Sequence, residues 1–106
     1  MKIKEQSNDG VIYQLEISYD KIGTALVDIS YSGYTDASEN DVLEFVWASA
    51  GETPNSELTD EQLDEINDIL ECGHEEQIVR FLMKHYEENS SIRFDVGEYD
   101  WIIKNT

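Results

Sequence analysis

Residues 58–71, LTDEQLDEINDILE, form the clearest helix signal in the chain. Thr59 has the side chain of an N-cap residue, and Gln62 three positions later completes a capping box. Gly73 follows closely and can adopt the left-handed conformation that ends many helices. The pattern therefore predicts a helix over about 59–71.

At 100° per residue this helix has one apolar face and one acidic face. The apolar residues are Leu63, Ile66, Ile69 and Leu70. The acidic residues are Asp60, Glu61, Asp64, Glu65, Asp68 and Glu71. Six pairs of these carboxylates are three or four positions apart, and at ~0.2–0.5 kcal/mol each they oppose the helix by about 1–3 kcal/mol. An ordinary solvated helix face would include lysine, so we interpret the acidic face as a surface for a positively charged partner.

The charge of the whole chain is strongly negative. Among 106 residues, 24 are Asp or Glu and 7 are Lys or Arg, which gives a net charge of −17. No Lys or Arg lies between Lys21 and Arg80. The acids in this interval are Asp28, Asp36, Glu39, Asp41, Glu44, Glu52, Glu57, Asp60, Glu61, Asp64, Glu65, Asp68, Glu71, Glu75 and Glu76. Such a surface repels nucleic acids and anionic membranes and attracts basic proteins, so direct DNA or RNA binding is not expected.

A second interpretation of this charge involves no partner. Acidity can simply maintain solubility, and a salt-adapted organism would show it in most of its proteins. Lysine is present at both ends of the chain and absent from the middle, which favours the interpretation as a binding surface.

The length of 106 residues predicts a single domain, residues 1–106, with one hydrophobic core. With 1 cysteine the chain can form no internal disulfide, which is typical of a reducing compartment. The beginning, MKIKEQSNDG, lacks the apolar run of a signal peptide, and no apolar stretch approaches the length of a membrane span. We therefore expect a cytoplasmic protein that does not bind membranes.

Alternating apolar residues predict strands before the helix. Residues 1–6, 11–19 and 24–31 are separated by the turn signals SNDG and DKIG, as in an antiparallel meander. The residues expected on the inner face of the meander are Val11, Tyr13, Leu15, Ile17, Tyr19, Ala25, Val27, Ile29 and Tyr31.

Further segments complete the predicted fold. Residues 41–50, DVLEFVWASA, fit either a strand or a short helix. Their β-branched and aromatic side chains favour a strand, in which Phe45 and Trp47 would share a face. A second helix is predicted over about 74–88. A C-terminal hairpin is predicted over two segments, 91–96 and 99–104. The expected fold class is α+β: an antiparallel sheet of five to six strands with the two helices packed on one face.

The residue types that carry chemistry give little support for catalysis. The chain has no Gly-rich phosphate loop, no nucleophile elbow and no His-Glu-x-x-His motif, so no enzyme activity is expected. Cys72, His74 and His85 lack the spacing of common zinc sites, and no EF-hand loop is present. We expect neither a metal nor another cofactor. The carboxylates next to His74 would favour its charged form.

The predicted partner-binding residues are centred on the acidic helix face. They are Asp60, Glu61, Asp64, Glu65, Asp68, Glu71, Glu57 and Glu75, with Tyr31 and Tyr34 as aromatic interface anchors. The composition resembles that of phage or mobile-element proteins that mimic DNA. It favours a small acidic inhibitor that occupies the basic nucleic-acid-binding surface of a nuclease, a restriction or CRISPR effector, or a DNA-binding protein. The alternatives are an immunity protein or antitoxin against a basic toxin, and a housekeeping or scaffold domain whose acidity serves solubility.

Overall fold

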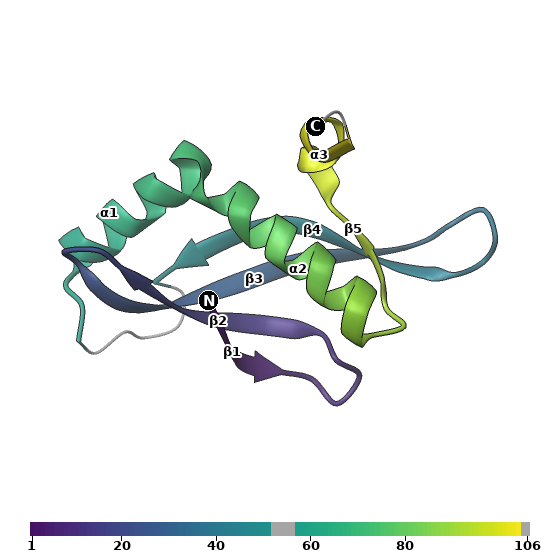
Figure 1. Cartoon of the computed structure of the whole chain (residues 1–106), viewed down its shortest axis with the longest axis horizontal. Helices are drawn as coiled ribbons and strands as arrows, with labels where there is room; N and C mark the ends of the chain where they lie inside the picture. The colour runs from purple at the N-terminus through teal and green to yellow at the C-terminus, as the bar shows by residue number, and fades with distance from the viewer. Residues whose placement is uncertain (52–56, 105–106) are drawn as a thin grey trace.

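A computed structural model of the chain describes residues 1–51 and 57–104. It has an α+β fold, as predicted, with one sheet in the order β1-β2-β3-β4-β5 (Figure 1). The strands are β1 (Lys2–Gln6), β2 (Ile12–Tyr19), β3 (Gly23–Thr35), β4 (Asp41–Ala50) and β5 (Arg93–Asp95). The helical elements are α1 (Asp60–Ile69), a π-helical turn η1 (Leu70–His74), α2 (Glu75–Asn89), a 3₁₀ turn η2 (Gly97–Tyr99) and α3 (Asp100–Lys104).

The first four strands form an antiparallel meander, which confirms the predicted order of strands. The third strand is longer than the predicted 24–31, because β3 continues to pair with β4 as far as Thr35. At the first turn, the Ser7 N–H donates to the Val11 carbonyl at 2.8 Å and the Gly10 N–H donates to the Ser7 carbonyl at 3.0 Å. Gly10 has a φ of 95°, a conformation that glycine adopts without steric cost. The ambiguous segment 41–50 is a strand throughout its length.

The predicted alternation of β2 is wrong at its beginning. Ile12 is fully buried and Tyr13 is half-exposed, the reverse of their predicted faces. The ladder between β2 and β3 reaches only to Gln14. Before that point, the Ile12 N–H donates to the Tyr86 hydroxyl at 2.9 Å, and the Ile12 carbonyl accepts from the Tyr31 hydroxyl at 2.6 Å. The register between β1 and β2 also shifts here, with Tyr13 as the extra residue in β2, and this bulge moves the preceding side chain to the other face.

A bulge in β4 separates two aromatic residues that were predicted to share a face. Phe45 is 2% exposed, whereas Trp47 is 50% exposed. The register between β3 and β4 shifts opposite Ser30, so that Trp47 pairs with Ser30 and its indole N–H donates to the Ser30 hydroxyl. A bulge adds one residue to a strand, which moves the following side chains to the other face.

The predicted C-terminal hairpin over 91–96 and 99–104 is wrong. Only β5 is a strand, and it runs parallel to residues 42–44 of β4 because the helical connection returns the chain to the same end of the sheet. The Gly97 N–H then donates to the Asp95 carboxylate at 2.9 Å, and Gly97 has a φ of 64°. This turn directs the chain out of the sheet and into η2 and α3.

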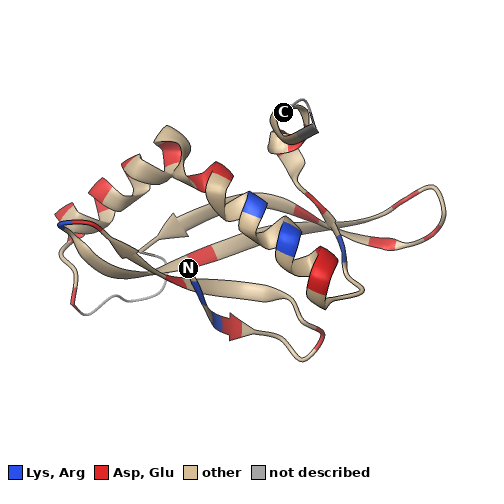
Figure 2. Cartoon of the chain, in the orientation of Figure 1, with Lys and Arg blue, Asp and Glu red and all other residues tan. Residues whose placement is uncertain are grey.

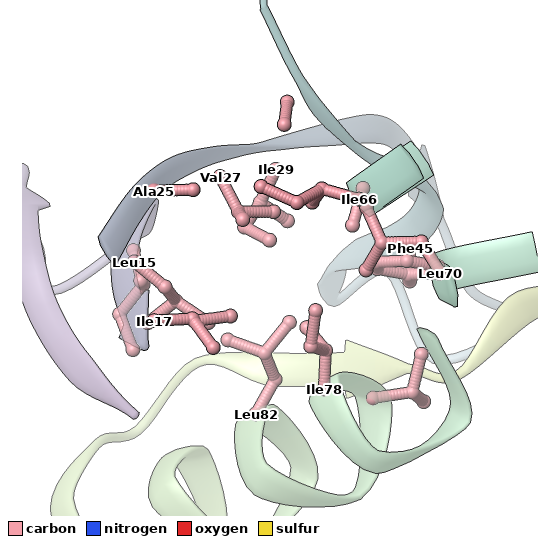
Figure 3. Close-up of a cluster of buried hydrophobic side chains, with 14 of the residues drawn as sticks. Leu15, Ile17, Ala25, Val27, Ile29, Phe45, Ile66, Leu70, Ile78 and Leu82 are labelled. Carbon is pink, nitrogen blue, oxygen red and sulfur yellow. The ribbon is translucent and has the colours of Figure 1, made fainter. Parts of the chain in front are cut away.

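Apolar side chains from the helices and the strands form one buried cluster (Figure 3). Its members include Leu15, Ile17, Ala25, Val27, Ile29 and Phe45 from the sheet, Ile66 and Leu70 from α1 and η1, and Ile78 and Leu82 from α2. Between the two helices the chain bends at Gly73, whose φ is 129°. Of the apolar residues predicted for the first helix, Ile66 and Leu70 belong to the cluster and Leu63 packs against it. The prediction is wrong for Ile69, which is 37% exposed. The buried residues determine which side of α1 faces solvent.

Candidate acidic interface

The acidic surface predicted from the sequence is present on α1. The capping box forms as predicted, because the Gln62 N–H donates to the Thr59 hydroxyl at 3.2 Å and the Thr59 N–H donates to the Gln62 side chain at 2.9 Å. Ile66 is fully buried, so the opposite side of the helix faces solvent. The exposed carboxylates there, named here the α1 acidic face, are Asp60, Glu61, Asp64, Glu65, Asp68 and Glu71 (Figure 2). Glu57, just before the helix, is also exposed.

Asn67 attaches α1 to the sheet, a role that the sequence analysis did not identify. Its side-chain amide donates to the Ala50 carbonyl at 2.8 Å, and its side-chain oxygen accepts from the Ala50 N–H at 2.8 Å. The amide thus takes the place of a neighbouring strand at the edge of β4. An uncharged polar residue among carboxylates was the only signal in the sequence that pointed to this contact.

Glu75 belongs to the fold and does not extend the α1 acidic face. One of its carboxylate oxygens accepts from the Ala48 N–H at 3.0 Å, and the other accepts from the Tyr99 hydroxyl at 2.5 Å. Burial and the bond to Glu75 raise the pKa of Tyr99 above its usual range. We therefore leave Glu75 out of the candidate interface.

The two tyrosines predicted as interface anchors lie away from α1. The Tyr31 hydroxyl is 2.8 Å from the Tyr86 hydroxyl in the partly buried site that holds Ile12. Burial, with the bond to Tyr86, raises the pKa of Tyr31. Tyr34 is exposed, and its hydroxyl donates to the Asp95 carboxylate at 2.7 Å, which raises the pKa of Tyr34 to about 12.

The negative charge is not continuous over the molecule. A second acidic group, Asp36, Glu39 and Asp41, lies at the turn between β3 and β4, at the opposite end of the long dimension from α1 (Figure 2). Between the two groups, α2 carries Arg80 and Lys84. The candidate interface is therefore the α1 acidic face alone, with Glu57 at its edge.

His74, at the end of η1, differs from the sequence-based expectation. Its ring Nδ1 is 3.0 Å from the Tyr19 hydroxyl. Burial lowers the pKa of His74, and the positive N-terminal amine lowers it further, whereas the neighbouring carboxylates were expected to favour the charged ring. Burial therefore outweighs the local acidic sequence at this position.

This lowered pKa predicts a loss of stability in mild acid. The unfolded chain binds a proton on His74 at a higher pH than the folded chain, so the free energy of unfolding should fall as the pH drops below about 6.5. Replacing His74 by Gln should make this fall shallower. Urea denaturation of both proteins between pH 7.5 and 5.5 measures the difference. If the free energy of unfolding falls equally with pH in both proteins, His74 does not cause the loss of stability.

Among residues 1–51 and 57–104, none of the helices is long and apolar enough to cross a membrane. Within the same residues, no group of three or more His, Cys, Asp and Glu side chains is placed to hold a metal ion. No protein-family model, curated protein or solved structure matches this chain.

Proposed function

We propose that the protein is a small acidic inhibitor whose α1 acidic face occupies a basic surface of a partner protein. The observation that supports this is the row of six exposed carboxylates, five on α1 and Glu71 on η1, in a stretch that contains no Lys or Arg. At ~1.5 Å of rise per residue, the row is ~17 Å long and carries about one charge per 3 Å. A single nucleic acid strand carries one charge per ~3.4 Å, so a surface that binds a phosphate backbone would also attract this helix.

The anchoring of α1 supports the same function. The capping box, the buried Ile66 and the two bonds from Asn67 hold the helix from its back. A helix held in this way presents its charges without losing much conformational freedom on binding. Its field would also speed the encounter with a basic partner, such as a nuclease, a restriction or CRISPR effector, or a DNA-binding protein.

Charge reversal on α1 tests the proposal. Replacing Asp64, Glu65 and Asp68 by Lys converts four of the six like-charge pairs into attractive pairs, so the free energy of unfolding should rise by about 1–3 kcal/mol. The same substitutions should abolish binding to the basic partner. The free energy of unfolding is measured by urea denaturation, and binding by capture from host lysate at low and high salt with competing DNA.

The matched control reverses three exposed charges elsewhere on the molecule. Replacing Glu5, Glu88 and Glu98 by Lys changes the net charge by the same amount and leaves α1 intact. This control should still capture a nucleic-acid-handling protein that salt or DNA releases. If both triple variants capture the same proteins as the wild type, the α1 acidic face is not the binding surface and the solubility alternative gains support.

A further inference from the structure

The strand β3 extends beyond the strand that pairs with it on one side. It pairs with β2 only over residues 23–28, but it pairs with β4 as far as Thr35. Figure 1 shows the outer parts of β3 and β4 extending past the end of α2. Residues 32–35 are all exposed. One edge of β3 therefore has no strand of the described chain beside it in this region.

The hydrogen bonds of β4 show which backbone groups of β3 face this edge. The N–H and the carbonyl of Ala50 both bind the side chain of Asn67, at the edge of β4 that faces away from β3. Val27, the β3 residue opposite Ala50, must therefore direct its backbone groups toward Leu15 of β2. Because successive residues of a strand face opposite sides, the odd-numbered residues of β3 face the β2 side.

The turn between β3 and β4 also indicates which residues of β3 face the β2 side. The Asp36 N–H donates to the Asn40 carbonyl at 3.0 Å across the turn, so the even-numbered residues face β4. The bulge adds a residue to β4 and leaves the alternation of β3 unbroken. Beyond the pairing with β2, the odd-numbered residues of β3 are Ile29, which is buried, and then Tyr31, Gly33 and Thr35. We consider only the last three. These three form what we call the β3 free edge.

An open cleft of about 650 Å³ lies next to the β3 free edge. Its lining includes Gly33 and Thr35 of β3 and Asp9 and Val11 of the first turn, together with residues 41–43 of β4 and 91–93 at β5. A Cβ atom placed on Gly33 would meet no atom within 4 Å. The space at Gly33 is therefore open, and a side chain of an added strand could lie there.

The charges around the cleft determine which strand would fit. Asp9 and Asp41 line the cleft, and the one basic residue in its lining, Arg93, is already 3.5 Å from the Asp36 carboxylate. A second copy of this chain would bring another net charge of −17 to the same place. We propose that the β3 free edge binds an extended, basic segment of a partner protein as an added strand. This inference shares with the proposed function only a basic partner, and it uses a different surface.

A synthetic peptide tests the inference on the wild-type protein. The probe is a ten-residue peptide of alternating Lys and Thr, and the control is the same peptide with N-methyl groups on its four central residues. Binding should slow hydrogen exchange at the amides of Tyr31, Gly33 and Thr35, as measured by NMR. The N-methylated peptide should bind at least about tenfold more weakly, because it lacks the backbone donors. Equal binding of the two peptides would overturn the proposal.

Substitutions at Gly33 give a second test. Gly33→Pro removes the central backbone donor of the β3 free edge and should weaken peptide binding about tenfold, while proline remains compatible with an edge strand. Gly33→Ala keeps the donor and should bind the peptide within about twofold of the wild type. Equal affinities of the two variants would overturn the proposal, as would a dimer that Gly33→Pro dissociates, since the edge would then bind a second copy.

The proposed function can fail independently of this inference. The variant with Lys at Asp64, Glu65 and Asp68 should bind the Lys-Thr peptide almost as the wild type does at 0.15 M salt. Charges on α1 are then screened over ~8 Å, whereas the molecule is 46 Å long. Loss of peptide binding in that variant would place the peptide on α1 and overturn the assignment to β3.

Discussion

Replacing Gly97 by Ala is expected to lower the free energy of unfolding by about 3 kcal/mol. The new Cβ atom would collide with the backbone carbonyl oxygen of Phe45. Gly97 also has a φ of 64°, where a residue other than glycine costs ~1–2 kcal/mol. Relief of the contact requires movement of the β4 backbone beside the buried Phe45 ring, and overpacking of this kind costs ~1–3 kcal/mol. Urea denaturation measures the loss.

Gly33→Ala is the matched control for this substitution. It adds the same methyl group to a glycine that has open space around it and no positive φ. We expect its free energy of unfolding to remain within ~0.5 kcal/mol of the wild type. Similar losses in the two variants would show that the close approach between Gly97 and β4 does not hold the C-terminal segment in place.

Glu75→Ala should have the second largest effect, a loss of about 2–3 kcal/mol. The substitution leaves the N–H of Ala48, a residue that is 7% exposed, without its acceptor, and it also removes the acceptor of the Tyr99 hydroxyl. A buried donor without a partner costs ~1–3 kcal/mol. The bond from Tyr99 also connects the C-terminal segment to α2, so this segment should become less protected from hydrogen exchange.

The neighbouring Glu76 is the control for Glu75. It forms an ion pair with Arg80 at 3.2 Å, and both side chains are about one-third exposed. Such surface pairs contribute ~0–1 kcal/mol, so Glu76→Ala should be nearly neutral. If both substitutions cost the same in thermal or urea denaturation, the two bonds of Glu75 do not stabilise the fold.

The first helix and its acidic face could be predicted because the signals are local. The capping box joins Thr59 and Gln62, which are three positions apart, and the spacing of Ile66 and Leu70 defines the face that packs. Backbone geometry alone brings such neighbours together. The same reasoning predicted the strands of the meander and identified 41–50 as a strand.

The positions where the prediction failed depend on contacts between distant segments. Glu75 and Ala48 are 27 positions apart, and Tyr31 and Tyr86 are 55 positions apart, so no local pattern could show that these side chains are used inside the fold. The hairpin predicted at the C-terminus failed because residues 97–104 are helical, and a short alternation of apolar residues does not by itself distinguish a strand from a helical segment.

The sequence by itself determined the α1 acidic face, since a helix with this periodicity must expose its carboxylates if its apolar side is buried. The tertiary structure alone decided where that helix is attached, which predicted site residues are used elsewhere, and where β2 leaves β3. These features depend on which backbone groups find partners after the chain has packed, and that choice is made between segments far apart in the sequence.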